Sequence, residues 1–418
     1  MKLLIFQTGE PIHSDADSPR PMRLINVSNA FAKKGHVVHI ISTSFSHQQK
    51  KHRNSPSFFK YSQSISYQLI SSPGYRANIG LERFLDHFIL AISLYKALRS
   101  LEFKPDAIFI GYPPIECALV AVLWAKYFRI PSFLDIKDSW PAMFADYVPP
   151  TYKWLVGLCT FPYSLMAQLS FRLADYIVTM SSSYLNWISR YSQRSLTESN
   201  SLILPLIPPS DASSSDDSTS LLCNYANAVL SNAPRSLPIF SFIGSLTASF
   251  DFTCLYKAVI ELNKSHEFLF VIAGDGSERE SIQRLFFDIP NVIFPGWLEY
   301  ADVKLLLSNS ICLVAPYRSI DNFTMNVPNK IVDSMAHKTT FLTSLGGEVR
   351  MLATEHNCGI ACHDTPDSWR ESMQLLIESP GLVEKLSSSS FKFYLENFTY
   401  DATYAKFVDY VSSVVQVR

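Results

Sequence analysis

The chain is 418 residues long, and 47% of its residues are hydrophobic whereas 17% are charged. This composition excludes a largely disordered chain, and the length predicts two or three domains. The formal net charge of −1 lacks the basic excess that nucleic-acid-binding proteins normally carry, so no nucleic-acid partner is expected. The seven cysteines are scattered, and we expect them to be reduced and mostly buried, as in a cytoplasmic protein.

The first half of the sequence alternates short apolar runs with longer segments of helical periodicity. The apolar runs predict buried strands, and the helical segments predict crossover connections in a parallel sheet that is covered on both faces. Gly35 directly follows the first predicted helix and is a typical C-terminal cap signal. The predicted strands are 3–7, 37–43, 107–110, 132–136, 176–179 and 202–206, and the predicted helices are 21–34, 81–101 and 115–128.

One segment of this half has the composition of a short membrane span. Residues 154–171 carry no formal charge and are bounded by Lys153 and Arg172. A spanning helix would put the strands before and after it on opposite sides of a bilayer, so we expect a helix packed on the sheet. The sharper hypothesis is that its outer face rests on an anionic membrane surface. The residues of that face and its surroundings are Phe144, Tyr147, Tyr152, Trp154, Phe161, Tyr163 and Met166.

The composition changes after residue 206. Residues 208–220 consist largely of Pro, Ser, Thr and Asp, which is typical of an exposed flexible linker, and the strand–helix alternation then begins again. We therefore expect a first α/β domain over 1–207, a linker over 208–237 and a second α/β domain over 238–397, with the last helix, 398–418, packed back on the first domain. The second half has predicted strands 239–243, 268–273, 292–294, 311–315 and 340–343, and predicted helices 252–262, 277–287, 302–307, 329–337 and 400–414.

Ligands of such folds bind beyond the carboxyl ends of the strands, and two facing domains would share a cleft there. The first candidate turn is Gly244-Ser245, where backbone N–H groups could approach an oxyanion at a helix N-terminus. An ordinary βα turn is the equally favoured alternative. The second is the turn of Gly274, Asp275 and Gly276, which lacks the further glycine of a dinucleotide fingerprint. It therefore predicts a loop beside a phosphate-bearing ligand.

The most informative stretch begins with Asn326, Val327 and Pro328. A proline at the start of a helix leaves backbone N–H groups pointing outward, and these donors together with Lys330 can hold a diphosphate. Asp333 follows on the first turn, where a carboxylate can accept hydrogen bonds from both hydroxyls of a ribose or sugar diol. The alternative is that Asp333 only complements the helix dipole, and this alternative is favoured when Asp333 is considered in isolation.

The ordered series of these motifs resembles the C-terminal domain of glycogen-synthase-like retaining glycosyltransferases. In the first half, the 35–38 entry to the second strand and the segment 133–141 resemble the bacterial polysaccharide and lipopolysaccharide branch of that group. The resemblance covers nearly the whole chain in order. Its motifs are Gly244-Ser245, Ala273-Gly274-Asp275-Gly276, Phe294-Pro295-Gly296-Trp297, Pro328-Asn329-Lys330, Asp333-Ser334-Met335-Ala336 and Gly346-Gly347-Glu348.

The resemblance implies a GT-B fold, in which two Rossmann-like, doubly wound α/β domains face a central cleft. It also implies a nucleotide-diphosphate sugar as donor, transfer with retention at the anomeric carbon, and neither a cofactor nor a bound metal. Asp333 stands where the group has a ribose-binding glutamate, and Met325 replaces a second glutamate near the donor sugar. The donor-binding candidates are Gly244, Ser245, Gly274, Asp275, Gly276, Trp297, Arg318, Asn326, Val327, Pro328 and Asp333.

A basic pair that the group carries beyond the Gly244 turn is missing here. Lys330 and Arg318 are the nearest substitutes for neutralising the leaving diphosphate, so Lys330 is a catalytic candidate. The second catalytic candidate is Asp138, which lies where the group's catalytic histidine, when present, follows a strand. Asp138 could orient the acceptor hydroxyl or steady positive charge on the sugar, and a helix N-cap ahead of Pro141 is the equal alternative.

The loop after the first strand supplies the acceptor-binding candidates Gly9, Glu10 and His13, because it replaces the glycine-rich first loop of many members. Asp15 and Asp17 have the spacing of a metal-binding pair, but they lie directly after the first strand, where the other large transferase fold does not place that pair. We expect no metal there.

We therefore expect a glycosyltransferase that uses a nucleotide-diphosphate sugar and a saccharide or lipid-linked acceptor in cell-surface polysaccharide synthesis. It would be cytoplasmic, with peripheral contact at the inner face of the cell membrane as the sharper hypothesis. Two alternatives stay open. A nucleotide-sugar epimerase of the same fold would need an acid–base pair beside the donor sugar, and no clear pair is evident. A catalytically weak partner subunit that keeps the fold would fit Asp333 and Met325.

Overall fold

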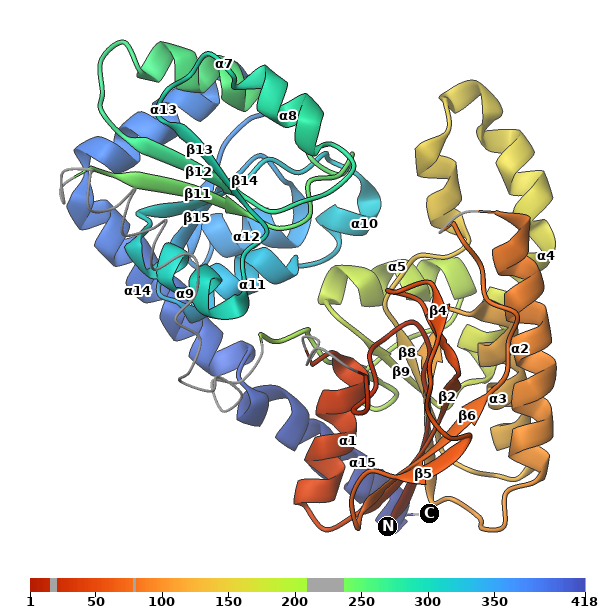
Figure 1. Ribbon diagram of the computed structural model, residues 1–418. Helices are drawn as coiled ribbons and strands as arrows, with labels where there is room; N and C mark the ends of the chain where they lie inside the picture. The colour runs from red at the N-terminus through yellow and green to blue at the C-terminus, as the bar shows by residue number, and fades with distance from the viewer. Residues whose placement is uncertain (16–20, 78–79, 209–236, 418) are drawn as a thin grey trace. The chain divides into compact units, whose positions relative to one another are not determined.

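The computed structural model describes residues 1–15, 21–77, 80–208 and 237–417. The chain divides into two compact units (Figure 1), with unit 1 formed by Met1–Leu206 and Tyr400–Arg418 and unit 2 by Ile207–Thr399. Each unit is a Rossmann-like α/β domain built on a parallel sheet, which confirms the predicted fold class. The predicted linker lies, except at its two ends, outside the described residues.

Unit 1 contains an eight-stranded sheet in the order β10–β9–β8–β7–β1–β2–β6–β5. Neighbouring strands pair parallel, except that β5 pairs antiparallel with β6. The order reverses between β1 and β7, because the chain adds β2 and β6 on one side of β1 and β7 to β10 on the other. The strands are β1 (Lys2–Phe6), β2 (Val37–Thr43), β5 (Phe58–Lys60), β6 (Ile65–Ile70), β7 (Ala107–Tyr112), β8 (Ser132–Ile136), β9 (Tyr176–Thr179) and β10 (Ser201–Ile203), with β3 (Phe45–Ser46) and β4 (Lys51–His52) forming a separate pair.

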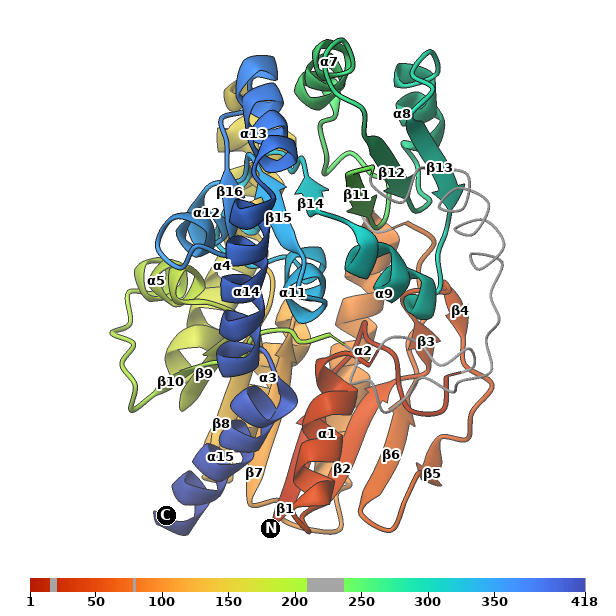
Figure 2. The same cartoon turned by 90° about the vertical axis from the view of Figure 1, so that its left-hand side faces the viewer.

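Helices cover both faces of this sheet. Figures 1 and 2 show α1 (Arg23–Lys33) and α15 (Lys406–Val417) on one face and α2 (Leu81–Arg99), α3 (Ile115–Tyr127) and α4 (Lys153–Leu173) on the other. α5 (Ser182–Ser192) contacts α4, and two short 3-10 helices, Ala142–Tyr147 and Pro150–Tyr152, precede α4. The ring of Phe407 in α15 lies 5.5 Å from that of Phe109 in β7, which joins the end of the chain to the core of unit 1.

The uncharged run 154–171 forms most of α4, and the amino-terminal half of this helix is exposed on nearly all sides. Among the described residues, no helix has both the length and the apolar character that crossing a membrane requires. Two residues of the predicted membrane face contact α2, since the Phe84 ring lies 5.2 Å from that of Tyr163 and 6.5 Å from that of Phe144. Both rings are half-buried, and the predicted contact of this face with a membrane stays a prediction.

Unit 2 contains a six-stranded parallel sheet in the order β13–β12–β11–β14–β15–β16, which reverses between β11 and β14. Its strands are continuous apolar runs because both faces are covered, with Phe240, Phe270 and Trp369 fully buried on one side. The strands are β11 (Ile239–Ile243), β12 (Leu269–Ala273), β13 (Val292–Gly296), β14 (Cys312–Ala315), β15 (Thr340–Thr343) and β16 (Gly359–Ala361). The helices are α7 (Thr253–Leu262), α8 (Arg279–Leu285), α9 (Tyr300–Asn309), α10 (Asp321–Thr324), α11 (Asn329–Ala336), α12 (Gly347–Thr354), α13 (Pro366–Glu378) and α14 (Pro380–Asn397).

Candidate functional site

The carboxyl ends of β11, β12 and β13 bring several predicted donor-binding residues to one edge of the unit 2 sheet. The Gly244 amide donates to the Ala273 carbonyl (3.0 Å), and the Gly274 amide donates to the Gly296 carbonyl (2.7 Å). Three successive βα turns are therefore joined by hydrogen bonds, and exposed Trp297 follows the third. Because β11 also borders the point where the strand order reverses, this edge is where open α/β sheets bind ligands.

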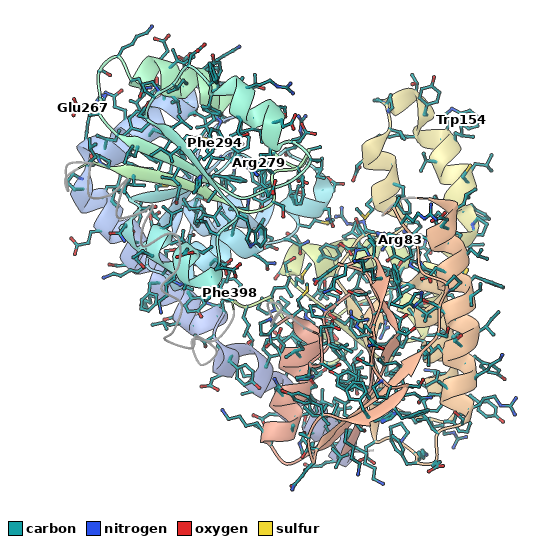
Figure 3. All side chains as sticks on the ribbon, viewed as in Figure 1. Arg83, Trp154, Glu267, Arg279, Phe294 and Phe398 are labelled. Carbon is teal, nitrogen blue, oxygen red and sulfur yellow. The ribbon has the colours of Figure 1, made fainter. Side chains whose placement is uncertain are left out.

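Two of these turns approach so closely that they require glycine. A Cβ at Gly274 would lie 1.9 Å from the carbonyl oxygen of Gly244, and one at Gly276 would lie 2.3 Å from that of Leu246. The Asp275 side chain accepts a hydrogen bond from the Gly276 amide (2.8 Å) and lies 3.5 Å from Arg279 of α8, which Figure 3 labels. The Asp275 carboxylate thus helps to hold the turn in shape.

The ammonium group of Lys330 lies in a cage of aromatic rings beside the Gly244 turn. Its Nζ is 3.8 Å from the ring centroid of Phe242, 3.9 Å from that of Phe250 and 5.3 Å from that of Tyr317. A Cβ at Gly244 would lie 3.0 Å from this Nζ. The Nζ atom is buried and has no hydrogen-bond partner in the part of the chain that the structure describes.

This enclosure has an electrostatic consequence. Burial lowers the pKa of Lys330 well below its ordinary value, and the nearby Asp333 carboxylate opposes that shift only in part. A buried ammonium that lacks hydrogen-bond acceptors is costly, whereas an anion that reached it would pair with it at low local dielectric. The cage is therefore suited to an anionic ligand that brings its own acceptors.

α11, the helix that carries Lys330, begins beside this cage with Pro328 as its N-cap, so its first N–H groups need partners from outside the helix. Asp333 lies on the same helix and is 8% exposed. Asn326 precedes the helix, and its buried Oδ1 has no hydrogen-bond partner among the described residues. Val327 is half-buried beside it. Arg318 is exposed and pairs with Asp251 at 3.5 Å.

The sequence analysis missed the aromatic cage. Phe242 is a strand residue, and Phe250 lies in the stretch beyond the Gly244 turn where the resembled group carries a basic pair. Phe250 and Tyr317 meet in an isolated antiparallel bridge with their ring centroids 4.6 Å apart. Since Tyr317 and Lys330 lie far from Phe242 and Phe250 in the sequence, only the fold brings the three rings around Lys330.

Unit 1 has a pocket of about 200 Å³ at the carboxyl ends of β1, β7 and β8, where its own strand order reverses. Gly9, Glu10 and Asp138 line this pocket, so the structure brings together two acceptor-binding candidates and one catalytic candidate. His13 does not line it. Its ring nitrogens contact the Tyr67 hydroxyl in β6 (2.5 Å) and the Asn29 side chain in α1 (2.9 Å), so it packs against these two elements instead.

Glu10 is buried and already has partners. It forms an ion pair with Lys137, and its other carboxylate oxygen accepts a hydrogen bond from the Leu24 amide (2.7 Å) at the start of α1. Glu10 therefore joins the loop after β1 to the loop after β8. Asp15 belongs to the aspartate pair at which no metal was expected. Both of its carboxylate oxygens accept hydrogen bonds from the Arg53 guanidinium, at 2.7 and 2.9 Å.

Asp138 lies on the wall of this pocket without a hydrogen bond or ion pair to any described residue. The short helix that follows has Pro141 as its N-cap and no side-chain cap, so the structure shows no capping role for Asp138. Burial raises the pKa of Asp138, and the cations Lys137 and Arg83 oppose that shift. The carboxylate is thus available to a ligand in the pocket.

A basic and aromatic wall of the pocket was not predicted from the sequence. The Arg83 guanidinium stacks on Trp140 at 4.4 Å and on Tyr75 at 5.3 Å. Burial and nearby cations lower the pKa of His47 to about 4 and that of His87 to about 3. Both imidazoles are therefore neutral near pH 7 and can donate or accept hydrogen bonds.

Residues 237–379 match the family model described as Glycosyl transferases group 1. The matched segment contains the whole unit 2 sheet, the Lys330 cage and Asp333, and it is less than half of the chain. The match supports a glycosyltransferase, as the sequence predicts. A search of curated proteins gave no match.

Solved structures similar to the chain show the same fold along its whole length. Sucrose-phosphate synthase from Thermosynechococcus elongatus is 12% identical with a TM-score of 0.71, and all of each chain is covered. WaaG, a glycosyltransferase involved in lipopolysaccharide biosynthesis, is 12% identical with a TM-score of 0.64, covering 98% of this chain and 99% of its own. HepE from Anabaena in complex with UDP-glucose is 12% identical with a TM-score of 0.61, and all of each chain is covered. These likenesses establish a GT-B fold.

Proposed function

We propose that the chain transfers a sugar from a nucleotide-diphosphate sugar to a saccharide or lipid-linked acceptor, with retention at the anomeric carbon, in cell-surface polysaccharide synthesis. The observation that carries the proposal is the buried Nζ of Lys330, which has no hydrogen-bond partner among the described residues and lies against the Gly244 turn. A diphosphate supplies the acceptors that this ammonium lacks. HepE, which shares the fold, was solved with UDP-glucose.

On the donor side, the diphosphate would lie against the Gly244-Ser245 turn and accept hydrogen bonds from Lys330 and the first N–H groups of α11. Asp333, one turn further along α11, would accept hydrogen bonds from the ribose diol. Trp297, exposed after β13, would border the nucleotide. Lys330 would then stabilise the charge that develops on the leaving diphosphate as the bond to the anomeric carbon breaks.

On the acceptor side, the hydroxyl would bind in the unit 1 pocket with Asp138 as its hydrogen-bond acceptor. The hydroxyl oxygen forms a bond to the anomeric carbon on the face from which the diphosphate departs, and its proton passes to an oxygen of that leaving phosphate. Asp138 orients the hydroxyl and steadies positive charge on the sugar. The neutral imidazoles of His47 and His87 add hydrogen bonds suited to further sugar hydroxyls.

A membrane contact at α4 would suit a lipid-linked acceptor. Trp154, Leu158 and Phe161 are 70%, 66% and 57% exposed on the amino-terminal half of this helix. Figure 3 shows Trp154 near the tip of the segment that protrudes from the rest of unit 1. Lys153 is exposed beside it and α4 contains no acidic residue, so an anionic surface at the inner face of the cell membrane complements the segment.

The proposal is tested with the purified full-length protein. A thermal-shift screen of nucleotide-diphosphate sugars would identify the donor, because a ligand that binds the folded state raises the melting temperature. Proton NMR of that donor with candidate acceptors would then follow the anomeric configuration of the product. A glycoside with the donor's configuration supports the proposal. Inversion refutes retention, and conversion of the donor into an epimer without transfer supports the epimerase alternative.

A further inference from the structure

The outer face of α2 carries a row of large apolar side chains that the described residues of unit 1 leave exposed. These five residues are between 44% and 86% exposed, whereas the opposite face of α2 is buried against the rest of the unit. We call this row the α2 seam. The seam consists of Leu81, Leu85, Phe88, Ile92 and Tyr95.

The spacing of the α2 seam indicates what kind of surface covers it. Its residues follow one another at intervals of four, three, four and three, which is the a/d repeat of a coiled coil. An apolar row with this period packs against one other helix, by side chains that fit between those of the partner. Contact with a lipid surface needs a broad apolar face and does not need the 3.5-residue period.

The charges beside the seam favour a second copy of the same helix. Glu82 is exposed near the amino-terminal end of α2, and Lys96 is exposed near the carboxyl-terminal end. Each directly follows a d position of the repeat, so both lie on the same side of the seam. In an antiparallel pair centred on Phe88, Glu82 of each helix faces Lys96 of the other. In a parallel pair, each of these side chains and its equivalent would lie on opposite sides of the seam, so neither Glu82 nor Lys96 would face an opposite charge.

We propose that the protein forms a symmetric dimer in which the α2 seams of two copies pack antiparallel about Phe88. The contact is isologous, because the same surface serves both partners and a two-fold axis passes beside Phe88. Leu81 of one copy then lies beside Tyr95 of the other, and Leu85 beside Ile92. Arg99, which lies over the Tyr95 ring at 5.8 Å, is exposed at the end that receives Glu82 of the partner.

Sedimentation equilibrium of the full-length protein tests the association. We expect a dimer for the unaltered protein and at least a 100-fold weaker association for Phe88→Asp, because that change puts a carboxylate at the centre of a buried seam. Phe287→Asp is the matched control, since Phe287 is 85% exposed in unit 2 and outside the seam. The control should remain dimeric. A monomeric unaltered protein, or a Phe88→Asp variant that still dimerises, would overturn the proposal.

Charge exchange and crosslinking test the orientation. Glu82→Lys alone and Lys96→Glu alone should weaken the dimer, and the double exchange in one chain should restore it. Leu81→Cys and Tyr95→Cys chains should form a disulfide when mixed and oxidised, but neither should crosslink with itself. Self-crosslinking of Leu81→Cys would show a parallel pair and overturn the antiparallel arrangement. The unaltered protein is the control for native cysteines such as exposed Cys159.

Discussion

The Nζ atom of Lys330 lies 3.8 Å from the centre of the Phe242 ring, with no hydrogen-bond partner among the described residues. The two residues lie in different elements, since Phe242 is in β11 and Lys330 is in the first turn of α11. A ring face attracts a cation but accepts no strong hydrogen bond, so it replaces only part of the lost hydration. The buried ammonium therefore destabilises the folded protein at the position proposed for the diphosphate.

Replacing Lys330 by methionine should separate stability from binding. Lys330→Met keeps the length of the side chain and removes the buried ammonium, so we expect a gain of about 1–3 kcal/mol in unfolding free energy at pH 7. Affinity for the nucleotide diphosphate should fall at the same time by about tenfold or more, because a hydrogen-bonded charge pair is lost. Chemical denaturation and calorimetric titration with UDP measure the two effects. A destabilised variant with normal affinity would contradict the assignment.

The same lysine predicts how stability depends on pH. The pKa of Lys330 is lowered in the folded state, so the unfolded chain binds more protons between that pKa and about 10.5. The unfolding free energy due to Lys330 therefore rises with pH across this window and levels off above it. Denaturation midpoints of the unaltered protein and of Lys330→Met, compared between pH 7 and 10, should converge as the pH rises. If the difference between the two midpoints stays constant with pH, burial of the Lys330 ammonium does not destabilise the folded protein.

Asp333→Ala should weaken nucleotide binding about tenfold or more, since a hydrogen bond to a charged group contributes about 1.5–3 kcal/mol. Asp333→Glu is the matched comparison, because it restores the carboxylate that the resembled group carries, one methylene longer. The unaltered protein should bind a 2′-deoxynucleotide more weakly than the corresponding ribonucleotide. The Asp333→Ala variant should bind the two nucleotides equally well. If Asp333→Ala leaves UDP affinity unchanged, the residue does not hold the ribose.

The sequence predicted the strands of the ligand edge more closely than the helices beyond it. Predicted strands 239–243 and 340–343 coincide with β11 and β15, because each is a short buried apolar run with a clear boundary. The sequence analysis did not predict α14, which contains four consecutive serines, a composition typical of loops. In the structure Ser390 is fully buried, and α14 packs on α11 and β15, so tertiary contact outweighs local propensity.

The residues of the candidate sites were likewise only partly predictable from the sequence. The glycine turns follow from strand boundaries, so Gly244 and Gly274 could be placed on one edge from the sequence. The Lys330 cage and the Arg83 wall could not, because each depends on side chains from separate elements that meet only in the folded chain. Asp138 was identified by its position after a strand, but its lack of a capping contact is visible only in the structure.

Asp138→Asn should lower the turnover number while leaving the melting temperature and donor affinity nearly unchanged, because the side chain neither caps the following helix nor pairs with a described residue. Burial raises the pKa of Asp138, so activity should fall as the pH drops through a value above the ordinary aspartate range. The asparagine variant should lack that acid limb. A variant that loses stability but keeps its specific activity would show a structural role.

Gly274→Ala should destabilise unit 2 by about 2 kcal/mol or more, because its Cβ would overlap the Gly244 carbonyl oxygen at 1.9 Å. The two turns can separate only by breaking the hydrogen bonds that join them, so UDP affinity should fall as well. Gly381→Ala in α14 is the matched control, since no atom lies within 4 Å of its added Cβ. Thermal unfolding and UDP titration of both variants provide the comparison. If both variants have the same melting temperature and UDP affinity, the two turns do not stabilise each other.

Liposome flotation tests the proposed membrane contact of α4. At low salt the protein should float with vesicles that contain anionic lipid, because Trp154 and Phe161 enter the headgroup region while Lys153 meets lipid phosphate. Trp154→Ser with Phe161→Ser should abolish flotation without lowering the melting temperature, since both side chains are exposed. Phe287→Ser, which removes a still more exposed ring from unit 2, should float like the unaltered protein. Retention of the unaltered protein in the lipid-free fraction, or flotation of the double variant, would show that α4 is not the membrane contact.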